Sequence, residues 1–182
     1  KILGYRSRSA FKLIELNKKY KFIKKNSKLL DIGAYPGGWA QVTSKIITTG
    51  KILSLDIKKM DELKNVSFLQ TDFLEEKTQD KIFNFFKDKL DVVISDMAAN
   101  TTGNKSLDSI RTNQLCAEVV RFSTKILKPN GVLVSKLFMG DDFVEVKELA
   151  KSRFKKVEFF KPEASRNESK ETYLHCVTLR TL

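Results

Sequence analysis

The 182-residue chain has little that would cross-link it or bind a transition metal. Its two cysteines, Cys116 and Cys176, are far apart and form no CxxC pair. This disfavours a disulfide scaffold and a zinc ribbon, and it favours a reducing compartment. The single histidine, His175, gives poor support for a His/Cys metal cluster or for hydrolysis by a His–Asp pair. We predict no metal. No apolar run approaches the roughly 18 residues of a membrane span, so we expect no membrane partner.

Acidic residues are also scarce relative to basic ones. Lysine and arginine number 34 against 22 aspartates and glutamates, giving a net charge of +12. Residues 1–28 carry ten bases and one acid, and residues 147–170 carry eight bases and four acids. The remainder is therefore close to neutral. Two basic segments on a neutral scaffold are typical of a surface that binds a polyanion such as nucleic acid. Solvated lysine-rich faces would give the same count.

Apolar, β-branched runs alternate with segments of helical spacing along the chain. Strands are expected at residues 28–33, 51–57, 66–72, 91–96, 132–138, 157–160 and 173–179. Helices are expected over about 5–22, after residue 38, over 107–127 and over 145–154. Ser7 or Ser9 would cap the first helix, and Pro129-Asn130-Gly131 would form a turn before the fifth strand.

This alternation predicts an α/β fold: a doubly wound, mostly parallel sheet of seven strands with helices on both faces. The length and the lack of any Pro/Gly/Ser-rich linker predict a single domain over residues 1–182, with the basic N-terminal helix packed on it.

Ligands of a doubly wound sheet bind beyond the carboxyl ends of its strands. The first strand leads into the segment 31–39, DIGAYPGGW, whose glycines would let a ligand approach the backbone, beside free N–H groups of the next helix. The second strand ends at Asp56, which suits ribose hydroxyls, and the third at Asp72, which suits an exocyclic amine. The fourth ends at Asp96, and the fifth carries Lys136.

Each of these features has a structural alternative. A Gly-Gly pair is more often a tight turn than a ligand loop, and a strand-end aspartate is more often a helix cap. Lys136 is harder to explain in this way, because a lysine within an apolar strand is unfavourable unless it is paired. Three strand-end aspartates in register with one strand lysine favour a functional site.

Six segments of the chain form a recognisable set: YRSRSAFKL at 5–13, DIGAYPGGWAQ at 31–41, Asp72-Phe73, SDMAAN at 95–100, VSKLF at 134–138 and KPEASRNESKETY at 161–173. Together they resemble the RrmJ/FtsJ family of S-adenosylmethionine-dependent ribosomal RNA 2′-O-ribose methyltransferases. They span nearly the whole chain in family order. The resemblance implies a Rossmann-like class I methyltransferase fold with an antiparallel last strand. Ala99 departs from the bacterial pattern, which usually has proline there, and this affects loop stiffness rather than chemistry.

The resemblance also implies roles for individual residues. The catalytic tetrad of the family maps to Lys12, Asp96, Lys136 and Glu171. The family's cofactor is S-adenosylmethionine, with S-adenosylhomocysteine as product. Its contacts are expected from Gly33, Pro36, Gly37, Gly38, Trp39, Asp56, Asp72 and Asp96. Together with the charge distribution, the resemblance predicts RNA contacts from Arg6, Arg8, Lys18, Lys19, Lys21 and Arg166.

The implied partner is RNA, with a uridine of the large ribosomal subunit or its precursor as target. We expect a monomer in the cytoplasm or in the matrix of a ribosome-containing organelle such as the mitochondrion. Methylation of a transfer RNA anticodon loop or a messenger RNA cap is the alternative among enzymes. A catalytically silent RNA-binding assembly factor is the alternative outside enzymes.

A ribose 2′-hydroxyl is a weak nucleophile, whereas a methyl group on a sulfonium is already activated, so the protein mainly aligns the two. Lys136 would either accept the hydroxyl proton as a neutral amine or remain charged and stabilise the alkoxide. Lys12 would lower the pKa of Lys136, and Asp96 and Glu171 would raise it. The residues alone leave both versions open.

Overall fold

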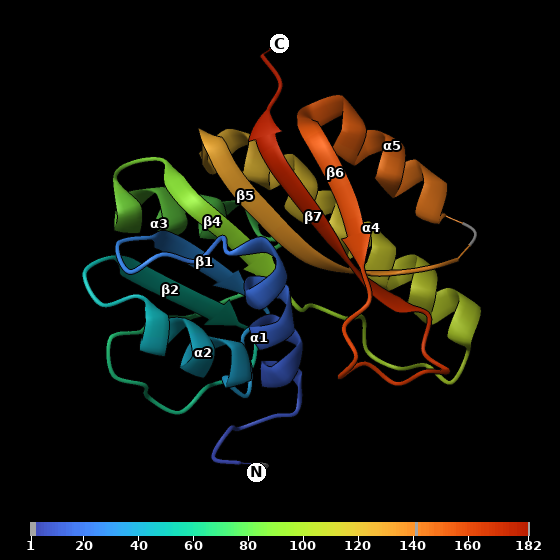
Figure 1. The fold of residues 1–182 in the computed structure, drawn as a ribbon, viewed down its shortest axis with the longest axis horizontal. Helices are drawn as coiled ribbons and strands as arrows, with labels where there is room; N and C mark the ends of the chain where they lie inside the picture. Colours follow the sequence, from blue (N-terminus) through green and yellow to red (C-terminus); the bar gives the residue numbers. More distant parts are fainter. Residues whose placement is uncertain (1–2, 141, 182) are drawn as a thin grey trace.

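The computed structural model describes residues 3–140 and 142–181 and contains one seven-stranded sheet (Figure 1). The strands are β1 (Lys28–Ile32), β2 (Lys51–Asp56), β3 (Ser67–Gln70), β4 (Leu90–Ser95), β5 (Leu127–Phe138), β6 (Phe154–Phe160) and β7 (Glu171–Leu179). The helices are α1 (Ser9–Tyr20), α2 (Gly38–Ile46), α3 (Glu76–Phe86), α4 (Lys105–Ile126) and α5 (Phe143–Arg153). Across the sheet the order is β3-β2-β1-β4-β5-β7-β6. The direction of winding therefore changes between β1 and β4.

The strand pairing confirms the predicted doubly wound α/β class. Strands β1 to β5 pair in parallel, whereas β7 lies antiparallel between β5 and β6. Central parallel strands are covered on both faces, and this explains their continuous apolar runs. Leu29 and Leu30 of β1 are both 0 % exposed, yet they belong to the two separate cores on opposite faces of the sheet.

Helices form a layer on each face of the sheet (Figure 1). On one face, Leu13 and Leu16 of α1 and Trp39 of α2 pack with apolar side chains of β1, β4 and β5. On the other face, α3, α4 and α5 cover the sheet, with Ile82 and Val119 in the shared core. Burying each such side chain contributes about 1.5–3 kcal/mol. The first layer matters for function because it holds α1 against the carboxyl ends of the strands.

The N-terminal helix is shorter than the expected 5–22, and its predicted serine cap is wrong. The helix begins at Ser9, and no side chain of the described residues caps it. Instead, the hydroxyls of Ser7 and Ser9 hydrogen-bond each other at 2.8 Å. The helix ends where Lys21 adopts a left-handed conformation and Asn17 Oδ1 accepts from the N–H groups of the next two residues.

Three further expectations differ from the structure. The predicted turn at residues 129–131 lies within β5, as a bulge. Leu127 pairs with Leu90 and Val132 with Val92, so four residues of β5 face one residue of β4. β3 ends at Gln70 rather than residue 72. Helix α3 is not among the expected helices, because its buried side chains are confined to every fourth residue of a polar segment. Within the described residues, no helix is long and apolar enough to cross a membrane.

Candidate active site

The carboxyl ends of β1, β2, β4 and β5 meet at one edge of the sheet, next to the change in strand order (Figure 1). The loop after β1 lies here, as do Asp56 at the end of β2 and Asp96 directly after β4. Lys136 lies near the end of β5 and contacts Asp96. This is the position at which doubly wound sheets bind ligands. Asp72 lies further from the end of its strand, since it follows the last residue of β3 by two positions.

The loop between β1 and α2 requires its glycines. Gly33 and Gly37 have φ angles of 75° and 117°, which favour glycine. A Cβ atom on Gly37 would lie 2.7 Å from Arg6, and one on Gly38 would lie 2.2 Å from the Ser7 hydroxyl. The glycines therefore let the N-terminal segment pack closely behind the loop. The first N–H groups of α2 have no intrahelical acceptor and can bind an anionic group.

Trp39 belongs to the protein core rather than to a ligand surface. Its side chain is 2 % exposed, and its indole N–H donates to the Ser9 carbonyl oxygen at 2.8 Å. A cofactor contact from Trp39 would therefore use the backbone. The side chain instead joins α2 to the start of α1.

The strand-end carboxylates of Asp56 and Asp72 already organise the backbone around them. Asp56 accepts from the N–H groups of Tyr35 and Lys58, both at 2.9 Å. Asp72 accepts from the N–H of Leu74 at 2.9 Å. Each carboxylate oxygen has further lone pairs, so the local bonds leave capacity for a ligand. The contact between Asp56 and Tyr35 also joins the end of β2 to the loop after β1.

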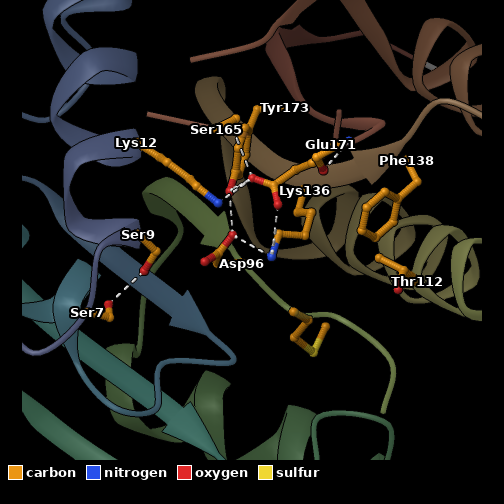
Figure 2. Close-up of polar contacts among 12 residues, drawn as sticks. Ser7, Ser9, Lys12, Asp96, Thr112, Lys136, Phe138, Ser165, Glu171 and Tyr173 are labelled. Carbon is orange, nitrogen blue, oxygen red and sulfur yellow. Dashed lines mark hydrogen bonds and ion pairs between the residues drawn. The ribbon is translucent and has the colours of Figure 1, made fainter. Parts of the chain in front are cut away.

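The four residues of the predicted tetrad converge in one cluster (Figure 2). Lys136 Nζ lies 3.2 Å from Asp96 Oδ1 and 3.8 Å from Glu171 Oε2. Lys12 Nζ, from α1, lies 2.6 Å from Glu171 Oε1. The four side chains are 10–16 % exposed. Two cations and two anions therefore alternate in a largely buried cluster, in which losing one member leaves another charge unpaired.

The cluster fixes the charge of its central members. Burial lowers the pKa of Lys136, but the carboxylates of Asp96 and Glu171 outweigh it and raise that pKa above its ordinary value. Burial raises the pKa of Glu171, but Lys136 and Lys12 outweigh it and lower that pKa. Lys136 is therefore charged and Glu171 ionised at neutral pH.

Two residues outside the predicted site also lie in this region. Tyr173 places its hydroxyl oxygen 2.6 Å from Asp96 and 3.0 Å from Glu171 (Figure 2). The signal for it was present in the sequence, because Tyr173 follows Glu171 by two residues on β7 and so shares its face of the sheet. Ser165 approaches Glu171 at 3.3 Å from the preceding loop, and nothing in the strand pattern indicates it.

Asp31, on β1, carries an unusual carboxyl group. It is 1 % exposed, and its Oδ1 has no hydrogen-bond partner among residues 3–140 and 142–181. Burial raises its pKa to about 7, the Ser54 hydroxyl lowers it, and the charges of Asp96 and Asp56 raise it further. Asp31 thus titrates near neutral pH, beneath the glycine loop.

Apart from Arg6, the predicted RNA contacts fall into two groups. Arg8 and Arg166 line a cavity of about 750 Å³ together with Lys12 and Glu171, a volume within the range of small-ligand sites. Lys18, Lys19 and Lys21 lie exposed at the far end of α1. By helix rise, Lys21 is about 13 Å from Lys12 along the axis. These lysines would extend a positive surface beyond the cavity.

Arg6 is engaged differently from Arg8. Its guanidinium donates to the carbonyl oxygens of Pro36, Asp61 and Glu62 at 3.2, 2.9 and 3.0 Å. It therefore links the glycine loop to the segment that follows β2. This geometry favours a role in holding these two loops together, and an RNA contact from Arg6 stays a prediction.

Two other observations bear on the chemistry. Within the described residues, no three His, Cys, Asp or Glu side chains gather in a way that could hold a metal ion. His175 stacks on Tyr20 with ring centroids 3.6 Å apart, and burial lowers its pKa to about 4. It is a neutral packed residue at neutral pH.

The sheet order, the antiparallel last strand and the glycine loop facing strand-end carboxylates define a methyltransferase of the Rossmann-like class. A crystal structure from Plasmodium falciparum, described provisionally as a ribosomal RNA methyltransferase, has a TM-score of 0.85 and 33 % identity and covers 96 % of this chain and 98 % of its own. The chain belongs to the FtsJ-like methyltransferase family, whose model matches residues 5–179.

Two bacterial relatives support this assignment. Ribosomal RNA large subunit methyltransferase E of Pelagibacter ubique is 46 % identical over 177 residues, covering 97 % of this chain and 87 % of the relative. The enzyme of the same name from Rickettsia akari is 45 % identical over 180 residues, covering 96 % and 79 %. The family resemblance inferred from the sequence is confirmed.

Proposed function

We propose that this methyltransferase transfers the methyl group of S-adenosylmethionine to a ribose 2′-hydroxyl of RNA. The observation that carries the proposal is the convergence of Lys12, Asp96, Lys136 and Glu171 at the strand ends where the glycine loop also lies. Lys12 and Glu171 of this cluster line the cavity. Two lysines held by two carboxylates can bind, orient and deprotonate a hydroxyl group.

The residues around the glycine loop fit S-adenosylmethionine. The first N–H groups of α2 suit its carboxylate, Asp56 suits the ribose hydroxyls, and Asp72 suits the adenine amine. Gly33 and Gly37 let the loop adopt left-handed conformations while Met97 and Arg6 pack closely against it. When bound, S-adenosylmethionine supplies a methyl group already activated for in-line displacement.

We assign Lys136 as the group that orients the 2′-hydroxyl and takes its proton. A weak acid such as a ribose hydroxyl needs a strong base, and the raised pKa of Lys136 makes its neutral amine a strong one. The neutral form is the minor one at pH 7, because Asp96 and Glu171 stabilise the charged amine. Lys12 holds Glu171 by a 2.6 Å contact, so that Glu171 is shared between the two lysines.

The proposed substrate is RNA of the large ribosomal subunit, as in the names of the relatives. Arg8, Lys12 and Arg166 line the cavity and would contact phosphates. The exposed lysines of α1 would contact the RNA further along. A uridine as target follows from the family resemblance.

The test is a map of 2′-O-methyl sites on ribosomal and transfer RNA from cells with and without the gene. We expect one site in large-subunit ribosomal RNA to disappear and transfer RNA to be unchanged. Loss of a transfer RNA site instead would reject the ribosomal substrate. An unchanged map, together with no methyl transfer by purified protein to ribosomal particles, would reject enzymatic activity and favour an assembly factor.

A further inference from the structure

Tyr173 lies at the reaction centre but has no part in the function proposed above. It is 0 % exposed, and it stands directly opposite Lys136 in the antiparallel pairing of β5 and β7. Opposite residues of such a pair project on the same side of the sheet. The ring packs 5.7 Å from that of Trp39, centroid to centroid, so that its hydroxyl is held in one place.

The hydroxyl of Tyr173 has one proton and two carboxylates within reach (Figure 2). Glu171 Oε1, at 3.0 Å, is also approached by Lys12 at 2.6 Å and by Ser165 at 3.3 Å. Asp96 Oδ1 is closer, at 2.6 Å, which is typical of a hydroxyl donating to a charged oxygen. The proton of Tyr173 is therefore donated mainly to Asp96.

Tyr173 cannot serve as the base of the reaction. Burial raises its pKa well above the ordinary value, and the charges of Asp96 and Glu171 raise it further. The phenol therefore keeps its proton and remains a donor. Any effect of Tyr173 on methyl transfer must act through the carboxylates that it contacts.

We propose that Tyr173 is a positioning residue for methyl transfer. Its hydroxyl and Lys136 Nζ both contact Asp96 Oδ1, so the hydroxyl fixes the orientation of the carboxylate and weakens the interaction of the carboxylate with the lysine. The inference rests on the proposed function, in which Lys136 takes the proton. Lys136 is faced by Asp96 from the end of β4 and by Glu171 from β7, with Lys12 of α1 on the other side of Glu171.

Removing the hydroxyl has a defined consequence. Asp96 Oδ1 would interact with Lys136 alone, at the present 3.2 Å or closer, and the carboxylate would lose the contact that fixes its rotation. The lysine would then release its proton less readily, and the hydroxyl of the substrate would be aligned less well. Binding of cofactor and RNA would stay the same, because Tyr173 is buried.

The experiment measures single-turnover methylation of ribosomal particles by Tyr173→Phe, Asp96→Asn, the double variant and Lys136→Ala. We expect Tyr173→Phe to be about tenfold slower, as for loss of one hydrogen bond to a charged group, with unchanged affinity for S-adenosylmethionine and RNA by calorimetry. In the Asp96→Asn background the same change should have little further effect. Tyr20→Phe is the matched control, since the Tyr20 ring is also packed, on His175, and it should react like the parent.

Two results would overturn the proposal. One is a Tyr173→Phe rate within threefold of the parent. The other is an equal slowing by Tyr173→Phe in the parent and in the Asp96→Asn variant, which a purely structural role would give. A Lys136→Ala protein that methylates like the parent would refute the proposed role of the lysine instead. If Tyr173→Phe does not fold, proton NMR of the parent decides. We expect a slowly exchanging, downfield phenol proton that moves upfield in Asp96→Asn, and its absence would overturn the proposal.

Discussion

The two sides of the site are built from different parts of the chain. On the cofactor side, the loop after β1 presents backbone groups and β2 ends in the carboxylate of Asp56, and these residues all lie between positions 33 and 56. On the reaction side, the chemistry lies in side chains that come from α1, β4, β5 and β7. Lys12 and Glu171, in contact there, are 159 positions apart.

This difference determines how each side responds to substitution. The cofactor side depends on backbone shape, so the sensitive positions are glycines and the residues that hold the loops. The reaction side depends on individual functional groups in a charged, buried cluster. A change on the first side should alter binding, and a change on the second should alter rate.

The largest effect is expected for Lys136→Ala. Methyl transfer should fall about 10²–10⁴-fold, the usual contribution of a general base. Affinities for S-adenosylmethionine and RNA should stay nearly unchanged, because the role of the lysine lies in the transition state. Single-turnover methylation of ribosomal particles measures the rate. A rate within threefold of the parent would remove Lys136 from the mechanism.

The pH dependence of the rate distinguishes the two possible roles of this lysine. Because carboxylates raise the pKa of Lys136, its neutral fraction grows about tenfold per pH unit through the neutral and mildly alkaline range. The single-turnover rate should rise in proportion from pH 6.5 to 9. A flat or falling profile would mean that the charged amine acts, as a stabiliser of the alkoxide.

On the cofactor side, Gly37→Ala should weaken binding rather than chemistry. Alanine is strained at a φ of 117°, and its Cβ would lie 2.7 Å from the Arg6 guanidinium. A shift of the loop should lower affinity for S-adenosylmethionine about tenfold, in line with 1–3 kcal/mol for such strain. Gly103→Ala is the control, with a φ of 89° and nothing within 4 Å. Equal losses of affinity in both variants would contradict the assignment of the loop.

Arg6 and Arg8 lie two positions apart in one motif, and substituting each of them tests the difference between cofactor binding and RNA binding. Arg8→Ala should weaken RNA binding and reduce the slope of log affinity against log salt by about one unit, as for one lost phosphate contact. Arg6→Ala should instead lower affinity for S-adenosylmethionine, because three carbonyl oxygens lose their donor. Salt-dependent RNA binding and calorimetry measure the two effects. The reverse pattern would place Arg6 on the RNA and Arg8 with the loop.

The last prediction concerns stability rather than activity, at Asp31. Its folded pKa of about 7 lies above the unfolded value, so the stability it contributes is present below about pH 4 and is lost as the pH rises to about 7. Asp31→Asn cannot ionise. Its melting temperature relative to the parent should therefore increase between pH 4 and 7 and then level off. A constant difference would show that Asp31 does not titrate in this range.

Much of this architecture could be predicted because it depends on local pattern. Alternating apolar runs and helical segments gave the sheet, and the rule that ligands bind at strand ends gave Asp56, Asp96 and Lys136. The different roles of Arg6 and Arg8 could not be predicted, since both are basic residues of one motif. Only the fold brings carbonyl oxygens to Arg6. The hydrogen bond between Ser7 and Ser9 could not be predicted either, because the rule for helix caps considers only bonds from a side chain to backbone N–H groups.

The position of β7 has a consequence for biosynthesis. This strand follows the other six in the sequence, yet it is inserted between β5 and β6 and carries both Glu171 and Tyr173. During translation, every other strand leaves the ribosome first, and β6 has no sheet neighbour until β7 pairs with it on one side and with β5 on the other. The nascent chain therefore completes both the charged cluster around Lys136 and its sheet in one late step. Until that step the edge of β5 is unpaired, and unpaired strand edges are sites at which chains can associate.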